Sequence, residues 1–231
     1  MSGTHIKVSA SGGGEFDCYL ALPAGKTQTP AIVLASAVHG VDIDIQRIAD
    51  EFAAAGYIAA APDLFWRTVP GPLKRGDDRS TKRSQPRLPV IKAGESDMAD
   101  ALAMVKKLPQ HNGKAVAMGF CFGGPYAVLG PKRLGYDAGI GCHSTQMKDF
   151  IQEFDGLAKP VCLIWGDEDH AAPVEVRTAY LEKAKAMSKL EVHVFPGIQH
   201  GYMMPGGGAA YSAETRQFSM GKALGLLGAL R

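Results

Sequence analysis

The chain has 231 residues, of which 46% are hydrophobic and 21% are charged, as expected for a globular domain with a sizeable core. Its formal net charge of +2 at pH 7 argues against a protein dedicated to binding nucleic acid. The polar, glycine-rich segment 1–15 lacks the apolar stretch of a signal peptide, and no apolar run is long enough to span a bilayer. We therefore expect a cytoplasmic protein, monomeric or homodimeric, that forms one domain over residues 1–231 and binds no membrane.

Predicted strands and helices alternate along the chain. We expect strands at 16–22, 31–36, 57–61, 115–118, 138–142, 161–165 and 191–195. We expect helices at 45–53, at 95–108, from 123 onward, at 174–187 and at 213–230, the first capped by Asp42 or Asp44 and ended by Gly56. Segment 68–92 contains four prolines and is predicted to be a long irregular loop. The alternation predicts a mostly parallel sheet with helices on both faces and a ligand site at the carboxyl ends of the strands.

One of the four cysteines stands in a motif typical of a catalytic nucleophile. Residues Gly119 to Gly123 read G-F-C-F-G, between an apolar strand and the start of a helix. Such a sharp turn exposes the central side chain and places the thiol at a helix N-terminus, where the thiolate is favoured. A core thiol is the alternative, and it is our interpretation of Cys18, Cys142 and Cys162, which lie in predicted strands without any C-x-x-C pair.

Two more polar segments follow predicted strands. Asp167 and Asp169 come directly after Trp165-Gly166, where a carboxylate can hold an imidazole in one tautomer. His200 stands on a short glycine-bounded loop after the last strand. Singly, such residues are more often solvated or hydrogen-bonded at the surface. Their chain order of nucleophile, acid and base is that of the α/β-hydrolases, so together they predict a catalytic triad on that fold.

The chain also resembles the dienelactone hydrolase family over nearly its whole length. A cysteine at the elbow is specific to this resemblance, because most α/β-hydrolases carry serine there. The matching segments are Gly40-Val41-Asp42, Gly56-Tyr57-Ile58-Ala59, Ala61-Pro62-Asp63-Leu64, Gly119 to Gly124, Gly166 to Pro173 and His200-Gly201-Tyr202.

The resemblance implies roles for several residues. The family's acid stands four residues before the proline of the segment D-H-A-A-P, which selects Asp169, with Asp167 as the fallback. The backbone amides of Phe122 and Val38 match the two oxyanion donors, which stabilise a tetrahedral transition state. The pocket is expected to be lined by Val38, His39, Trp66, Phe122, His143, Tyr202, Met203 and Met204.

Two positions depart from family members that open dienelactones. Those members carry a glutamate at the position of Ala37 and an arginine, which receives the substrate carboxylate, at the position of Met204. Both differences argue against dienelactone itself and favour neutral esters.

The resulting prediction is a cysteine-dependent hydrolase of small esters or lactones that works through a thioester intermediate, without cofactor or metal. One alternative is a promiscuous hydrolase of activated phosphotriesters and aryl esters that uses the same triad. Another is a hydrolase-fold binder or thiol redox sensor without catalytic activity, since an exposed cysteine of low pKa also suits a sensor.

Overall fold

The computed structural model describes residues 2–25 and 27–231, and within them one sheet of eight strands forms the centre of the molecule. The strands are β1 (Thr4–Ser9), β2 (Glu15–Ala21), β3 (Thr29–Ala35), β4 (Ile58–Pro62), β5 (His111–Phe120), β6 (Ala138–Cys142), β7 (Val161–Glu168) and β8 (Leu190–Gln199). Their order is β1-β2-β4-β3-β5-β6-β7-β8, antiparallel as far as the β2–β4 pair and parallel from β4 onward.

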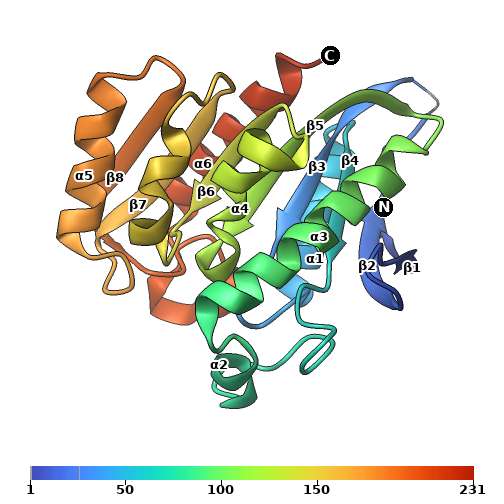
Figure 1. The fold of residues 1–231 in the computed structure, drawn as a ribbon, viewed down its shortest axis with the longest axis horizontal. Coiled ribbons are helices and arrows are strands. Elements are labelled where there is room, and N and C mark those ends of the chain that lie inside the picture. The colour runs from blue at the N-terminus through green and yellow to red at the C-terminus, as the bar shows by residue number, and fades with distance from the viewer. Residues whose placement is uncertain (1, 26) are drawn as a thin grey trace.

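Helices cover both faces of the sheet (Figure 1). Helices α1 (Ile43–Ala54) and α6 (Ala213–Gly228) pack on one face, and α3 (Arg87–Lys106), α4 (Tyr126–Leu129) and α5 (Val174–Lys185) pack on the other. Helix α1 shows why: Ile45, Ile48 and Phe52 recur at helical spacing and are buried. The side chain of Asp42 caps its first turn by accepting from two backbone amides. This arrangement is the predicted α/β-hydrolase fold.

The segment expected to be one irregular loop is partly helical. It contains helix α2 (Arg79–Arg83), and helix α3 begins at Arg87 rather than at the predicted Glu95. Pro89 lies in the first turn of α3, where a missing backbone N–H leaves no hydrogen bond unmade. Strand β1 and the 3₁₀ stretch Met147–Phe154 were not predicted either.

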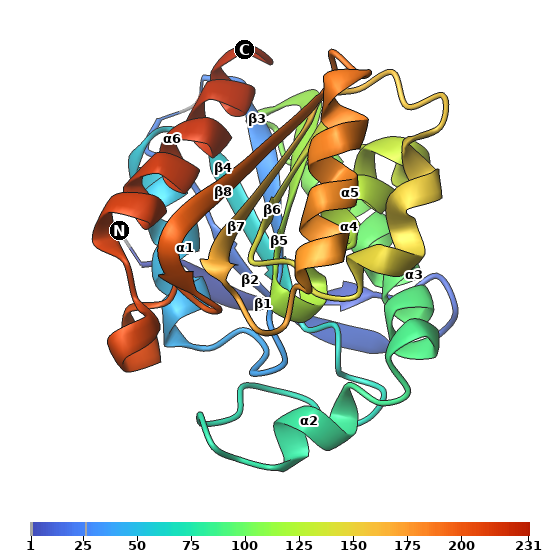
Figure 2. The ribbon, with the colours of Figure 1, turned by 90° about the vertical axis from the view of Figure 1, so that its left-hand side faces the viewer.

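The register of the sheet brings the predicted site residues together. Phe120 pairs with Cys142 across β5 and β6, so the residues that follow them, Cys121 and His143, are neighbours at the edge of the sheet. Glu168 pairs with Gln199 across β7 and β8, which makes neighbours of the next residues, Asp169 and His200. Helix α2 lies beyond this carboxyl end of the strands (Figure 2). In the described ranges, none of the helices combines the length and the apolar character that crossing a membrane requires.

Candidate active site

The turn after β5 holds Cys121 in a strained conformation. Its φ of 52° lies in the left-handed region, which residues other than glycine rarely adopt. The flanking glycines permit this turn, because a Cβ at Gly119 would lie 2.1 Å from the carbonyl oxygen of Gly123. A Cβ at Gly123 would lie 2.2 Å from the carbonyl oxygen of Ala35. The G-x-C-x-G pattern therefore has a steric cause, and its consequence is a partly exposed thiol at the turn.

The loops after β7 and β8 bring an acid to a histidine. The Nδ1 atom of His200 lies 2.8 Å and 3.0 Å from the two carboxylate oxygens of Asp169, whose side chain is fully buried. Asp169 also accepts a hydrogen bond from the backbone amide of Ala171. This double contact at Nδ1 fixes the ring and leaves Nε2 for the cavity that His200 shares with Cys121.

Cys121 and His200 perturb each other's titration. Burial tends to raise the pKa of the Cys121 thiol, but the His200 imidazole, Arg87 and the Phe122 amide favour the thiolate, so the pKa is lowered overall. Burial tends to lower the pKa of His200, but Asp169 and Cys121 raise it to about 10. The lowered pKa of Cys121 and the raised pKa of His200 both favour an ion pair, in which Cys121 is a thiolate and the proton is on His200.

The neighbouring acid, Asp167, has a different environment. Its side chain accepts a hydrogen bond of 2.7 Å from the backbone amide of Gly197 and so ties the end of strand β7 to strand β8. The guanidinium of Arg177 donates to the backbone carbonyls of Asp167 and Asp169 and so holds the end of β7 and the start of the following loop. Of the two candidate acids, the structure places Asp169 against His200 and Asp167 against backbone.

Of the two residues predicted to supply the oxyanion donors, Phe122 lies in the turn directly after Cys121, and Val38 is held through its carbonyl by a buried arginine. The Phe122 amide is adjacent to Cys121 and favours its thiolate. Arg83, which is 2% exposed, donates from Nε and Nη2 to the carbonyl of Val38 and from Nη1 to the carbonyls of Val69 and Gly71. Its guanidinium stacks 4.3 Å from the centre of the Phe65 ring, which packs on the Phe122 ring. No sequence motif marks Arg83 for this role, because a basic residue in a polar segment is usually solvated.

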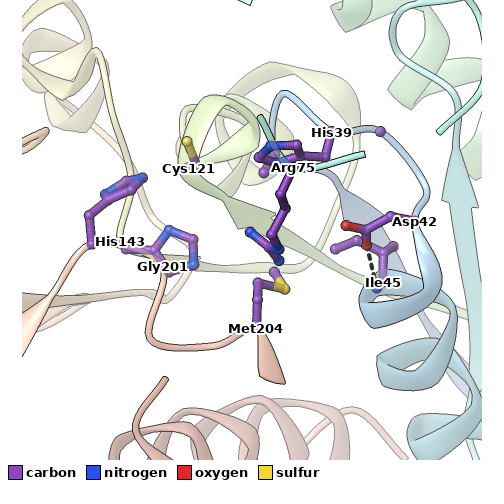
Figure 3. Close-up of a pocket in the computed structure, with 11 residues that line it drawn as sticks. His39, Asp42, Ile45, Arg75, Cys121, His143, Gly201 and Met204 are labelled. Carbon is purple, nitrogen blue, oxygen red and sulfur yellow. Dashed lines mark hydrogen bonds between the residues drawn. The ribbon is translucent and has the colours of Figure 1, made fainter. Parts of the chain in front are cut away.

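A small cavity opens beside Cys121 (Figure 3). Its lining residues come from the loop after β3, the start of α1, segment 71–78 and the ends of β5, β6 and β8. They are Ala37, His39, Gly40, Asp42, Ile45, Arg75, Cys121, His143, His200, Gly201 and Met204. His143 stands on one side of Cys121, and His39 and Asp42 stand on the other.

Five residues that were predicted to line the pocket do not line this cavity: Val38, Trp66, Phe122, Tyr202 and Met203. Trp66 donates its indole N–H to the buried carboxylate of Asp97 and packs on Phe16. Tyr202 is fully buried behind His143, and its hydroxyl is 2.9 Å from that of Ser219. Met203 is fully buried in the core under α1 and α6. Of the others, His39, His143 and Met204 line the cavity.

Arg75 was not predicted as a pocket residue, yet its side chain extends across the cavity toward Met204 (Figure 3). Its Nη2 lies 3.0 Å from the carboxylate of Asp44, which is 3% exposed and also accepts from the amide of Gly206. Asp42, with a pKa raised mainly by burial, lines the same wall. The Met204 side of the cavity therefore has an arginine that is already paired with a carboxylate.

The other three thiols are buried, as predicted for core residues. Burial raises the pKa of Cys18 and of Cys142 to about 12 and raises that of Cys162 further. In the described part of the chain, one group has atoms close enough together to hold a metal: Cys162, Glu191 and His193. The carboxylate of Glu191 already accepts from His193 and from the ammonium of Lys222, so a cation there would displace an existing one.

Comparison with known proteins agrees with this architecture. Residues 16–230 match the model of the dienelactone hydrolase family. The carboxymethylenebutenolidase of Pseudomonas putida is 26% identical over 200 residues, which cover 85% of this chain and 84% of that protein. Carboxymethylenebutenolidase 1 of Cupriavidus pinatubonensis is 25% identical over 195 residues, which cover 83% of this chain and 82% of that protein.

The solved structure of the dienelactone hydrolase-like promiscuous phosphotriesterase P91, from metagenomic libraries, has the same fold. It superposes with a TM-score of 0.82 at 18% identity and covers 100% of this chain and 99% of that one. The family model matches most of the chain, and the fold and the relatives agree with it. The chain therefore belongs to the dienelactone hydrolase family and is a hydrolase with the α/β-hydrolase fold.

Proposed function

We propose that this hydrolase cleaves small esters or lactones through a thioester on Cys121, with His200 as the general acid and base and Asp169 as the acid that orients it. One observation carries the proposal. The hydrogen bond of 2.8 Å between His200 Nδ1 and Asp169 turns the other nitrogen of the ring to a cavity that also contains the strained, partly exposed Cys121. These groups have the arrangement that nucleophilic catalysis requires.

The reaction then proceeds in two halves. The thiolate of Cys121 attacks the carbonyl carbon, and the carbon–oxygen π pair moves to the oxygen. Collapse of this intermediate breaks the bond to the alkoxy oxygen, which takes the proton from His200 and leaves as the alcohol. In the second half, neutral His200 removes a proton from water as the water attacks the thioester. Collapse releases the acid and returns the thiolate, with the proton on His200.

The developing oxyanion is assigned to the amides of Phe122 and Val38. Preorganised donors of this kind act where charge appears in the transition state, and losing one typically costs about a hundredfold to a thousandfold in rate. Arg83 supports this assignment, because its two hydrogen bonds to the Val38 carbonyl restrain that peptide segment.

The small size of the cavity favours small substrates. An aryl phosphotriester belongs in the substrate panel beside carboxylic esters, because the same thiolate can attack phosphorus. A redox sensor would need the reactive thiol alone and would have no use for the Asp169–His200 hydrogen bond.

The test is to trap the acyl-enzyme. Mixing the protein with p-nitrophenyl butyrate and quenching in acid should give a species carrying one butyryl group, located on Cys121 by peptide mapping. Cys121→Ala should lose the adduct and at least about a thousandfold of the turnover rate. Cys162→Ala is the matched control, because that thiol is buried, and it should retain both. An adduct on another residue, or substantial turnover by Cys121→Ala, would contradict the proposed mechanism.

A further inference from the structure

His143 is a buried histidine with no partner for either ring nitrogen. It is 1% exposed, and within residues 2–25 and 27–231 neither Nδ1 nor Nε2 makes a hydrogen bond. Leaving a buried polar group unpaired is destabilising, so native proteins rarely retain one without a reason. His143 is also one of the residues that line the cavity containing Cys121.

The backbone of His143 is also strained. Its φ of 40° lies in the left-handed region, although the residue is not a glycine. Two contacts maintain this conformation: the amide of His143 donates to the carbonyl of Ile164, and the Thr145 amide donates to the carbonyl of Cys121. Residues held in such conformations cluster at functional sites. The same local structure that positions Cys121 therefore turns the imidazole of His143 to the cavity.

The charge state of His143 suits a hydrogen-bonding role. Burial holds its pKa well below the usual value, and the charge of His200 acts in the same direction. A neutral imidazole has one N–H donor and one nitrogen acceptor, so it can pair with an ether oxygen or with a hydroxyl group.

Its place in the cavity indicates which part of a substrate it would meet. The ring of His143 packs edge-on against that of His200, with ring centres 4.9 Å apart. It lies on the side of Cys121 away from His39 and Asp42 (Figure 3). The departing alcohol must lie within hydrogen-bond reach of His200 to be protonated. The alcohol portion of an ester therefore passes beside His143.

We propose that His143 is a specificity residue that hydrogen-bonds a second polar atom in the leaving alcohol, so that alkoxyalkyl and hydroxyalkyl esters are favoured over plain alkyl esters. This inference rests on the proposed ester hydrolysis at Cys121. It adds a substrate class that follows from the unpaired imidazole alone.

The experiment compares 2-methoxyethyl butyrate with n-butyl butyrate, which differ by one oxygen in place of one methylene. The measured quantity is the ratio of their kcat/KM values in wild type and in His143→Phe. Because both enzymes see the same pair of esters, the intrinsic reactivity of the esters cancels. We expect the ratio to fall by about tenfold in His143→Phe, the size of one net hydrogen bond. His143→Asn, which tolerates the left-handed backbone and keeps an amide, should retain part of the preference.

Tyr202→Phe is the matched control, because it changes the ring packed behind His143 without touching the cavity, and its ratio should equal that of wild type. The melting temperature of His143→Phe should not fall, since the substitution removes an unpaired buried group. Equal ratios in wild type and His143→Phe, or equal losses on both esters, would overturn the inference while leaving the hydrolase mechanism intact. If wild type hydrolyses neither ester, the proposed function itself fails.

Discussion

The two sides of the cavity are built from different kinds of structure. On one side, Cys121, His143 and His200 each follow a parallel strand directly, and the pairing of those strands fixes their positions. On the other side, Arg75 comes from the long connection after β4, and Asp42 comes from the cap of α1. The first side carries strained backbone and an unpaired imidazole, whereas the charges on the second are paired or hydrogen-bonded. From this contrast we infer that the residues at the strand ends carry out the reaction, whereas residues on both sides of the cavity determine which substrates bind.

The largest effect on catalysis is expected from removing His200, the histidine that follows strand β8. His200→Ala should lower kcat/KM for p-nitrophenyl butyrate by at least about a thousandfold, because the thiol loses its base and the alcohol loses its acid. Asp169→Asn should cost less, about a hundredfold, since an orienting residue is partly replaceable. Asp167→Asn is the matched control, because its carboxylate accepts from the backbone amide of Gly197 in strand β8, and its effect should be within about threefold. A severe loss at Asp167 with a mild one at Asp169 would reverse the assignment.

Arg83 tests how far the long connection supports the strand-end chemistry. Arg83→Lys should lower kcat by about tenfold or more with little change in KM, because a single ammonium cannot hold the Val38, Val69 and Gly71 carbonyls together. Arg79→Lys, in the same short helix but exposed and paired with Asp77, should change neither constant. A loss confined to KM or to the melting temperature would mean that Arg83 supports the fold and not the oxyanion segment.

The pH dependence of kcat/KM sharpens the assignment of charge. The reactive form has thiolate Cys121 and protonated His200, so activity should rise with pH through the lowered pKa of the thiol. It should then fall as pH passes the raised pKa of His200, about 10. Asp169→Asn removes the main contact that raises the histidine pKa, so the high-pH limb should move to lower pH. A limb that stays in place would show that Asp169 does not set the charge of His200.

The residues at the strand ends could be predicted from the sequence more easily than the connection between β4 and α3, and the reason is physical. The glycines around Cys121 are required by backbone contacts near 2 Å, so the turn leaves a local pattern in the sequence. Helix α2 and the start of α3 leave no such pattern, because residues such as Leu88, 45% exposed, blur the apolar periodicity. The burial of Arg83 depends on three carbonyls from two distant segments, and no local motif records it.

The last prediction concerns the second side of the cavity: neutral esters should be hydrolysed faster than carboxylated analogues. Arg75 lines the cavity together with Met204, which stands where the family's arginine would be, but its guanidinium is already paired with Asp44, and Asp42 lies on the same wall. Two carboxylates and one guanidinium leave that wall without spare positive charge. A substrate carboxylate would therefore be desolvated there without gaining a free cation, which is unfavourable.

Met204 offers the variant that decides whether this charge balance matters. Met204→Arg adds a second guanidinium to the cavity, and a charge-assisted hydrogen bond to a carboxylate is worth about 1.5 to 3 kcal/mol. The neutral preference in kcat/KM should therefore narrow by about tenfold or more in Met204→Arg, while Met204→Leu, the control for the change of side chain, should leave it unaltered. A wild-type enzyme that favours the carboxylated ester by tenfold, about 1.4 kcal/mol, would contradict the prediction. It would mean that Arg75 leaves Asp44 to bind the substrate carboxylate, and that the charged residues opposite the strand ends take part in substrate binding.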